Sequence, residues 1–127
     1  MVTESNKTIG DVVDFILLNR GDRSFVDWSE PDILWRLQKA TAENTLCYCT
    51  NEYTGNITGV MIGEIRETNK FYIVNILSTE RNMPKFINFI VLNHPYCNCI
   101  ATMRHGRFYK EYPMTTDMYY KFMKGTK

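Results

Sequence analysis

Hydrophobic residues recur three and four positions apart in two segments at the start of the chain, the spacing of one helix face. Thr8 and Asp11 have the spacing of a capping box, and Gly21 follows the first segment as a helix stop. Ser29 stands at the N-cap of the second segment, and Pro31 falls in its first turn. The pattern predicts two helices ahead of any strand.

Strand-like patterns follow these helices. The residues predict strands over Thr45–Thr50, Ile57–Arg66 and Phe71–Leu77. The last of these is almost continuously apolar, which is typical of a central strand buried on both faces. After a break, hydrophobic residues return to helical spacing and predict a helix over Pro84–Asn93.

The C-terminal part predicts a strand over Asn98–Met103, a short amphipathic helix over Arg104–Tyr112 and a final strand over Met118–Phe122. The predicted order is therefore α-α-β-β-β-α-β-α-β within a single domain, residues 1–127. This order predicts an α/β (α+β) fold with a mixed, mostly antiparallel sheet flanked by helices. A ligand in such a fold would lie where the crossover helix begins.

Gly59 and Gly63 share one face of the strand predicted over Ile57–Arg66. Glycine inside a strand marks a place where a large side chain packs, or where a ligand or another backbone approaches closely. The sequence leaves both interpretations open.

Charge is almost balanced, with 15 Lys and Arg residues against 14 Asp and Glu residues. No long basic block is present, so the sequence carries no strong nucleic-acid signal. No apolar run approaches the roughly 20 residues of a membrane span, and Met1–Lys7 lacks the apolar core of a signal peptide. We therefore expect a soluble, cytoplasmic protein with no membrane partner.

Four cysteines form two Cys-x-Cys pairs, Cys47 with Cys49 and Cys97 with Cys99. Structural zinc favours cysteines separated by two to four residues on a turn, whereas strand residues two apart share one face of an extended backbone. We expect no metal site and interpret the cysteines as small buried residues that face a helix. A Cys-x-Cys metal protein is the alternative.

Two local motifs accompany this order of elements. Arg81-Asn82-Met83-Pro84-Lys85-Phe86 precedes the crossover helix, and Phe108-Tyr109-Lys110-Glu111-Tyr112-Pro113-Met114 follows the next strand. The first resembles the pyrophosphate signature of the GNAT family of N-acetyltransferases, Arg/Gln-x-x-Gly-x-Gly/Ala. The second resembles that family's Phe-Tyr-x-x-x-Gly-Phe segment. Pro84 and Phe86 stand at the small-residue positions of the first motif.

This resemblance implies a GNAT-like fold and an acetyl-CoA-dependent transfer of an acetyl group to an unidentified acceptor amine. It places the coenzyme at the start of the crossover, where its diphosphate would meet backbone amides and the charges of Arg81 and Lys85. The residues expected to bind acetyl-CoA are Ile76, Leu77, Ser78, Arg81, Asn82, Met83 and Lys85.

For catalysis, Tyr109 matches the family's general acid, and Glu64 is the candidate base for the acceptor amine. Each has a simpler interpretation, Tyr109 as a core tyrosine and Glu64 as a salt-bridged strand residue. Trp28 and Trp35 fall in the helical part that shapes the acceptor site in the family, and we expect them to pack the helices onto the sheet. His94 is expected to be a capping or surface residue.

A second hypothesis is a non-catalytic GNAT-like protein with a structural or interaction role, for example a bacteriophage particle component. The short chain and the atypical pyrophosphate loop fit this hypothesis. Its partners would be proteins of an assembly, and its location would be the viral particle.

Overall fold

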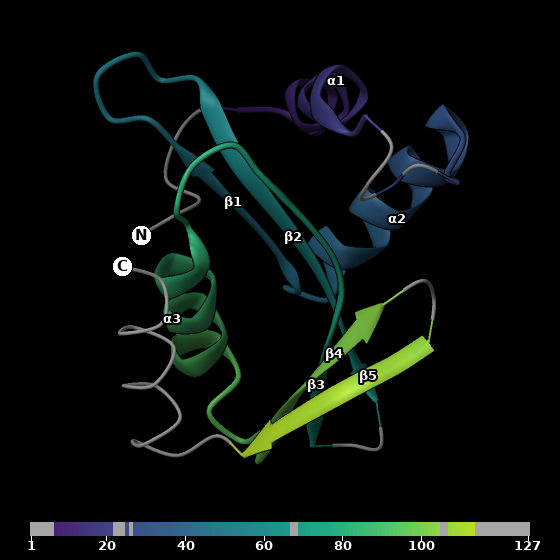
Figure 1. Cartoon of the computed structure of the whole chain (residues 1–127), viewed down its shortest axis with the longest axis vertical. Coiled ribbons are helices and arrows are strands. Elements are labelled where there is room, and N and C mark those ends of the chain that lie inside the picture. The colour runs from purple at the N-terminus through teal and green to yellow at the C-terminus, as the bar shows by residue number, and fades with distance from the viewer. Residues whose placement is uncertain (1–6, 22–24, 26, 67–68, 105–106, 114–127) are drawn as a thin grey trace.

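The computed structural model describes residues 7–21, 25, 27–66, 69–104 and 107–113 of the 127-residue chain. These residues form three helices and a five-stranded, mostly antiparallel sheet, a mixed α+β architecture (Figure 1). The elements are α1 (Ile9–Asn19), α2 (Glu30–Ala42), β1 (Leu46–Thr50), β2 (Ile57–Arg66), β3 (Lys70–Ser78), α3 (Met83–Asn93), β4 (Cys99–Arg104) and β5 (Arg107–Pro113).

The first two helices begin where their capping residues predict. The Thr8 hydroxyl accepts from the Asp11 amide at 3.2 Å, and the Asp11 carboxylate accepts from the Thr8 amide at 2.9 Å, a complete capping box. The Ser29 hydroxyl caps α2 by accepting from the Asp32 amide at 3.3 Å. No helix in the described ranges is long and apolar enough to cross a membrane.

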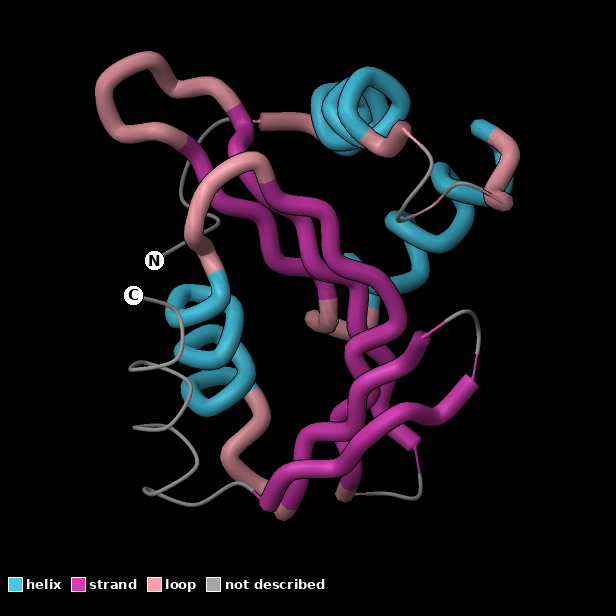
Figure 2. Tube along the Cα trace, viewed as in Figure 1, coloured by secondary structure: helices cyan, strands magenta, loops and turns pink. Residues whose placement is uncertain are grey.

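The strands lie in the sheet in chain order, from β1 to β5 (Figure 2). β1–β2, β2–β3 and β4–β5 are antiparallel pairs, whereas β3 and β4 are parallel. Parallel neighbours require a crossover connection, and α3 supplies it. The predicted mixed, mostly antiparallel sheet with one crossover helix is confirmed.

The helix predicted over Arg104–Tyr112 is wrong, because this segment forms most of β5, antiparallel to β4. Arg104 pairs with Arg107, so only two residues connect the strands, and the second is Gly106. A two-residue connection with glycine is typical of β-hairpins, and the Phe and Tyr residues of the segment favour a strand. Pairing with β4 therefore decides the structure here. The final strand predicted over Met118–Phe122 lies outside the described residues.

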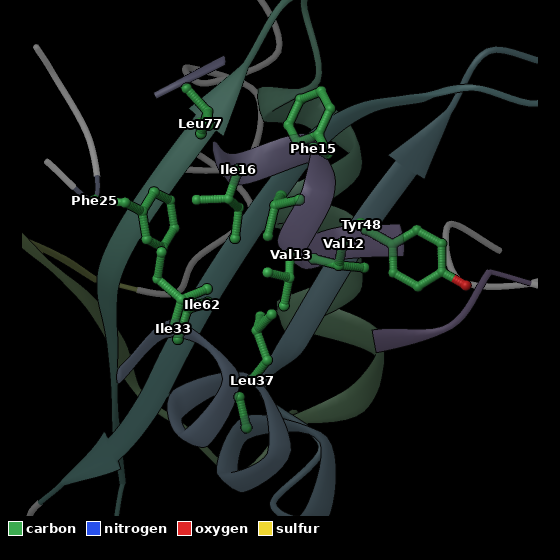
Figure 3. Close-up of a cluster of buried hydrophobic side chains, with 12 residues drawn as sticks. Val12, Val13, Phe15, Ile16, Phe25, Ile33, Leu37, Tyr48, Ile62 and Leu77 are labelled. Atoms are coloured by element: carbon green, nitrogen blue, oxygen red, sulfur yellow. The ribbon is translucent and has the colours of Figure 1, made fainter. Parts of the chain in front are cut away.

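Helices cover both faces of the sheet, α1 and α2 on one face and α3 on the other (Figure 1). Side chains from α1 and α2 converge on β2 in the first hydrophobic cluster (Figure 3). Successive side chains of β2 point to opposite faces of the sheet. Val60 and Ile62 belong to the cluster under α1 and α2, and Met61 belongs to the cluster under α3.

The Gly63 position on β2 is filled by a side chain. A Cβ atom there would overlap the ring of Phe71, which is completely buried. β2 also shifts its register against β3 between Ile62 and Gly63, as in a β-bulge. Of the two interpretations that the glycine pattern left open, packing by a large side chain is the one that holds at Gly63.

Candidate functional site

The start of the crossover lies at the junction of β3 and α3, and β3 is the middle strand of the sheet (Figure 1). The parallel register covers only Lys70–Ile73 against Cys99–Thr102, whereas β3 continues to Ser78. β4 and β5 turn away from the β3–α3 junction (Figure 1). In open α/β sheets, ligands bind beyond the carboxyl ends of the parallel strands, and this junction lies at the carboxyl end of β3, which is parallel to β4.

α3 begins without a side-chain cap, unlike α1 and α2. Asn82 holds the N-cap position, but its side chain makes no capping hydrogen bond, and Pro84 in the first turn has no N–H to offer. The remaining amides carry the positive end of the helix dipole, and Arg81 and Lys85 are exposed beside them. The charge distribution at this helix end therefore favours an anion.

The Asn82 side chain instead ties the crossover to β2. It is 2% exposed and donates to the hydroxyls of Ser78 at 2.9 Å and Thr58 at 3.2 Å. The Thr58 carbonyl in turn accepts from the Thr79 amide at 2.8 Å. Gly59 leaves room for these groups, because a Cβ there would lie 2.6 Å from Asn82 Nδ2 and 2.9 Å from Ser78 Oγ.

Phe86 stands at a position where the pyrophosphate signature of the GNAT family has a small residue. Its side chain is 1% exposed and belongs to the hydrophobic cluster under α3. This part of α3 is therefore packed against the sheet. An anion at this helix end would contact the amides that precede Phe86, together with Arg81 and Lys85.

The remaining residues predicted to bind coenzyme face two different cores. Leu77 is buried in the cluster under α1 and α2, whereas Ile76 and Met83 pack against the cluster under α3. Five of the seven predicted residues lie along the β3–α3 junction itself: Ser78, Arg81, Asn82, Met83 and Lys85. Of these, the exposed Arg81 and Lys85 carry positive charge.

Glu64 lies well away from the crossover. It stands five positions after Gly59 on β2, which corresponds to about 17 Å of strand. Its carboxylate forms an ion pair with the Arg66 guanidinium at 3.1 Å. That hydrogen bond, aided by the charges of Arg66, Lys39 and Arg36, lowers the pKa of Glu64 despite partial burial. Its surroundings are those of a salt-bridged strand residue.

Tyr109 lies on β5, and the structure describes only its backbone. The register of β5 shifts at this point, since Lys110 pairs with Thr102 and Phe108 pairs with Met103. Thr102 also pairs with Ile73, the last residue of the parallel β3–β4 register. The Tyr109 backbone therefore lies where β4 leaves β3, and its role as general acid stays a prediction.

All four cysteines are buried, and none of them forms a disulfide. Cys47, Cys49 and Cys97 belong to the cluster under α3. The Cys47 thiol donates to Cys49, and burial raises the pKa of Cys47. The residues described in the structure contain no group of three or more side chains arranged to hold a metal. The cysteines occupy the small, buried positions that the sequence suggests.

His94 ends α3, as expected of a capping residue, but it is 3% exposed. Its Nε2 lies 2.6 Å from the Asn44 carbonyl oxygen, and its Nδ1 lies 3.0 Å from the Tyr96 hydroxyl. A neutral ring that donates from Nε2 and accepts at Nδ1 satisfies both contacts. His94 therefore joins the end of α3 to the turn that precedes β1.

Sequence reasoning missed one surface. Trp35 is 56% exposed instead of packing a helix onto the sheet, whereas Trp28 is half-buried against Phe25 at a ring distance of 5.1 Å. Arg36 lies over both tryptophan rings. The pattern of α2 offers one signal, because Trp35 and Lys39 are four residues apart on a face next to the apolar stripe.

Comparison with known proteins gives no match: no family model fits the chain, and no curated protein or solved structure is significantly similar to it. The function therefore has to be argued from the sequence and the geometry.

Proposed function

We propose that this protein binds acetyl-CoA at the β3–α3 junction and is a GNAT-like N-acetyltransferase with an atypical pyrophosphate loop. The observation that supports this most is the uncapped start of α3, flanked by exposed Arg81 and Lys85 at the carboxyl end of the central strand β3. This donor and charge set fits a diphosphate, which is held by amides and cations and needs no protein acceptor.

In this proposal, Arg81 and Lys85 pair with the diphosphate, and the amides of Asn82, Met83 and Lys85 donate to it. Ile76, Leu77 and Ser78 lead from this point along the strand towards the region where β4 leaves β3. Bound acetyl-CoA would supply the thioester that an acceptor amine attacks. Only the charged parts of the loop resemble the family signature, so we expect moderate affinity.

For the transfer step, Tyr109 is the proposed proton donor to the departing thiolate. Glu64 is the proposed base, which takes the proton of the acceptor amine directly or through water. Because Arg66 holds Glu64 in its ionised form, Glu64 would accept a proton only weakly. The acceptor amine is not identified, and a cytoplasmic location fits this activity.

A non-catalytic GNAT-like protein is the second candidate, with a structural or interaction role such as that of a bacteriophage particle component. The observation that favours it is the packing of the crossover. Asn82 holds Ser78 and Thr58, and Phe86 fills the core, so the loop is stabilised without any ligand.

Titration calorimetry with acetyl-CoA and with CoA separates the two candidates. We expect micromolar binding of both. Removing one charged contact to the diphosphate, by Arg81→Gln or Lys85→Gln, should weaken binding by about 1.5–3 kcal/mol, roughly 10- to 150-fold. Lys7→Gln removes one positive charge at the start of α1 and should leave the affinity unchanged.

Absence of binding at millimolar acetyl-CoA would favour the second candidate, and the next measurement would then be a search for a protein partner. Binding that all three variants weaken equally would count against the β3–α3 junction as the site.

A further inference from the structure

Trp35 stands out on α2 because its indole is 56% exposed, although tryptophan is among the more buried residue types. The guanidinium carbon of Arg36 lies 5.6 Å from the centre of its ring, and the ammonium nitrogen of Lys39 also lies 5.6 Å away. Both cations thus lie over the ring, which keeps more than half of its surface exposed.

The described residues leave the donors of these two cations unused. Within the part of the chain that the structure describes, Arg36 and Lys39 form no hydrogen bond and no ion pair. Glu64 is near both, but its carboxylate is paired with Arg66 at 3.1 Å. Arginine alone carries five N–H donors, so this surface can bind acceptor groups beyond those that the described residues provide.

Arg66 extends the same surface from α2 to the sheet. Its side chain is 41% exposed and lies 4.7 Å from the ring of Tyr72. A small hollow of about 10 Å³ between Arg36, Lys39, Glu43 and Glu64 holds little more than one water-sized group. A ligand would therefore lie along the surface. We call Trp35, Arg36, Lys39 and Arg66 the α2–β2 patch.

We propose that the α2–β2 patch binds single-stranded nucleic acid, with a base stacked on Trp35 and backbone phosphates paired with Arg36, Lys39 and Arg66. An exposed aromatic ring beside cations is the combination that unpaired bases and phosphates require. Glu43 and Glu64 reduce the local positive charge, and they can accept hydrogen bonds from amino groups of bases.

An acidic peptide fits the patch less well than a nucleic acid does. It would use the three cations but would leave the exposed indole without a planar partner. The patch lies on the α1–α2 face of the sheet, whereas the proposed coenzyme site lies at α3 on the other face. Coenzyme binding and nucleic-acid binding can therefore be tested separately, although Glu64, the proposed base, lies beside the patch.

The test is a titration of the 127-residue chain with a single-stranded oligonucleotide of about 10 nucleotides, followed by tryptophan fluorescence and by anisotropy of a labelled strand. We expect quenching on binding. With three phosphate contacts, the slope of log K against log salt concentration should be about −2.

Trp35→Ala should weaken binding roughly 5- to 150-fold, because it removes one stacking contact. Arg36→Gln with Lys39→Gln should bring the salt slope close to −0.7. Tyr53→Ala is the matched control, since Tyr53 is 89% exposed on the β1–β2 turn, and it should bind as the unchanged protein does. Arg81→Gln and Lys85→Gln should also leave nucleic-acid binding unchanged.

Three results would overturn the proposal: no binding at low salt, duplex DNA or poly-glutamate bound as tightly as the single strand, or affinity unaffected by Trp35→Ala. Because Trp35 is exposed, this variant should fold, and circular dichroism verifies that. A failure of acetyl-CoA to bind would leave this result untouched.

Discussion

At the scale of single residues, the two glycines of β2 stand where neighbouring side chains pack directly against the backbone of the strand. Gly63 faces the buried ring of Phe71, and Gly59 faces Asn82 and Ser78. Neither has the left-handed backbone that would require glycine for conformational reasons, since positive φ occurs at Gly21 and Gly55 among the described glycines. Space for neighbouring side chains is therefore the reason for both.

Gly63→Ala should destabilise the fold, because the added methyl group would overlap the completely buried ring of Phe71. Overpacking of this kind costs about 1–3 kcal/mol. Urea unfolding followed by circular dichroism measures the loss. Gly10→Ala in α1 is the control, because its methyl group would lie an ordinary 3.5 Å from Thr8 Oγ1. Equal stability of the two variants would contradict the packing argument.

Glu64 should make stability depend on pH in the acid range. Its pKa in the folded protein lies below the ordinary value of 4.5, chiefly because Arg66 donates to it. A lowered carboxyl pKa contributes stability above the unfolded-state pKa, and this contribution disappears as pH falls through the folded-state value. The free-energy difference between the unchanged protein and Glu64→Gln should therefore shrink between neutral pH and pH below about 4.

Arg66→Gln removes the main cause of this shift and should give a similar pH profile. Combining the two substitutions should add little to either one alone, because they remove the same ion pair. A difference in unfolding free energy that stays constant across pH would show that the pair does not matter for stability.

At the scale of elements, the start of α3 is held both by packing in the core and by hydrogen bonds to β2. The helix packs through Phe86, Ile87 and Ile90, and its first residues are joined to β2 through Asn82 and Thr58. Placing glycine at both Pro84 and Phe86 would therefore remove a core side chain, at a cost of about 3–5 kcal/mol. Pro84→Gly alone is the appropriate variant for asking whether an extra amide improves coenzyme binding.

Asn82→Ala should loosen the crossover, because the Ser78 and Thr58 hydroxyls lose their buried donor. The expected cost is about 1–3 kcal/mol. Asn88→Ala, on the exposed face of the same helix, should change stability little. Chemical denaturation of both variants gives the comparison. If Asn82→Ala were as stable as Asn88→Ala, the network would have no role in holding the crossover.

At the scale of the whole molecule, one sheet separates two hydrophobic clusters, and β2 contributes to both. Leu37 and Ile90 are completely buried, one in each cluster. Leu37→Ala and Ile90→Ala should each lower the unfolding free energy by about 2–5 kcal/mol. Because the clusters share strands, each variant should unfold in one transition that fluorescence and circular dichroism report at the same midpoint.

Leu92→Ala is the control on α3, since Leu92 is 69% exposed, and its effect should lie within about 0.5 kcal/mol. Two separate transitions for Ile90→Ala would show instead that α3 and its cluster unfold independently of α1 and α2.

The sequence by itself determined the elements whose signals are local. Capping residues placed the starts of α1 and α2, and alternation placed β2 at Ile57–Arg66. These signals succeed because caps and hydrophobic periods act within a few residues of the chain. The order of strands and the crossover followed from them, and with these the place of the candidate site at the β3–α3 junction.

Tertiary structure decided what depends on contacts between distant segments. The segment predicted as a helix over Arg104–Tyr112 became β5 because β4 offers it a partner. The burial of Asn82 and Phe86, the pairing of Glu64 with Arg66 and the exposure of Trp35 all depend on which elements meet. No local pattern contains that information, because a side chain's neighbours are set by the packing of the whole fold.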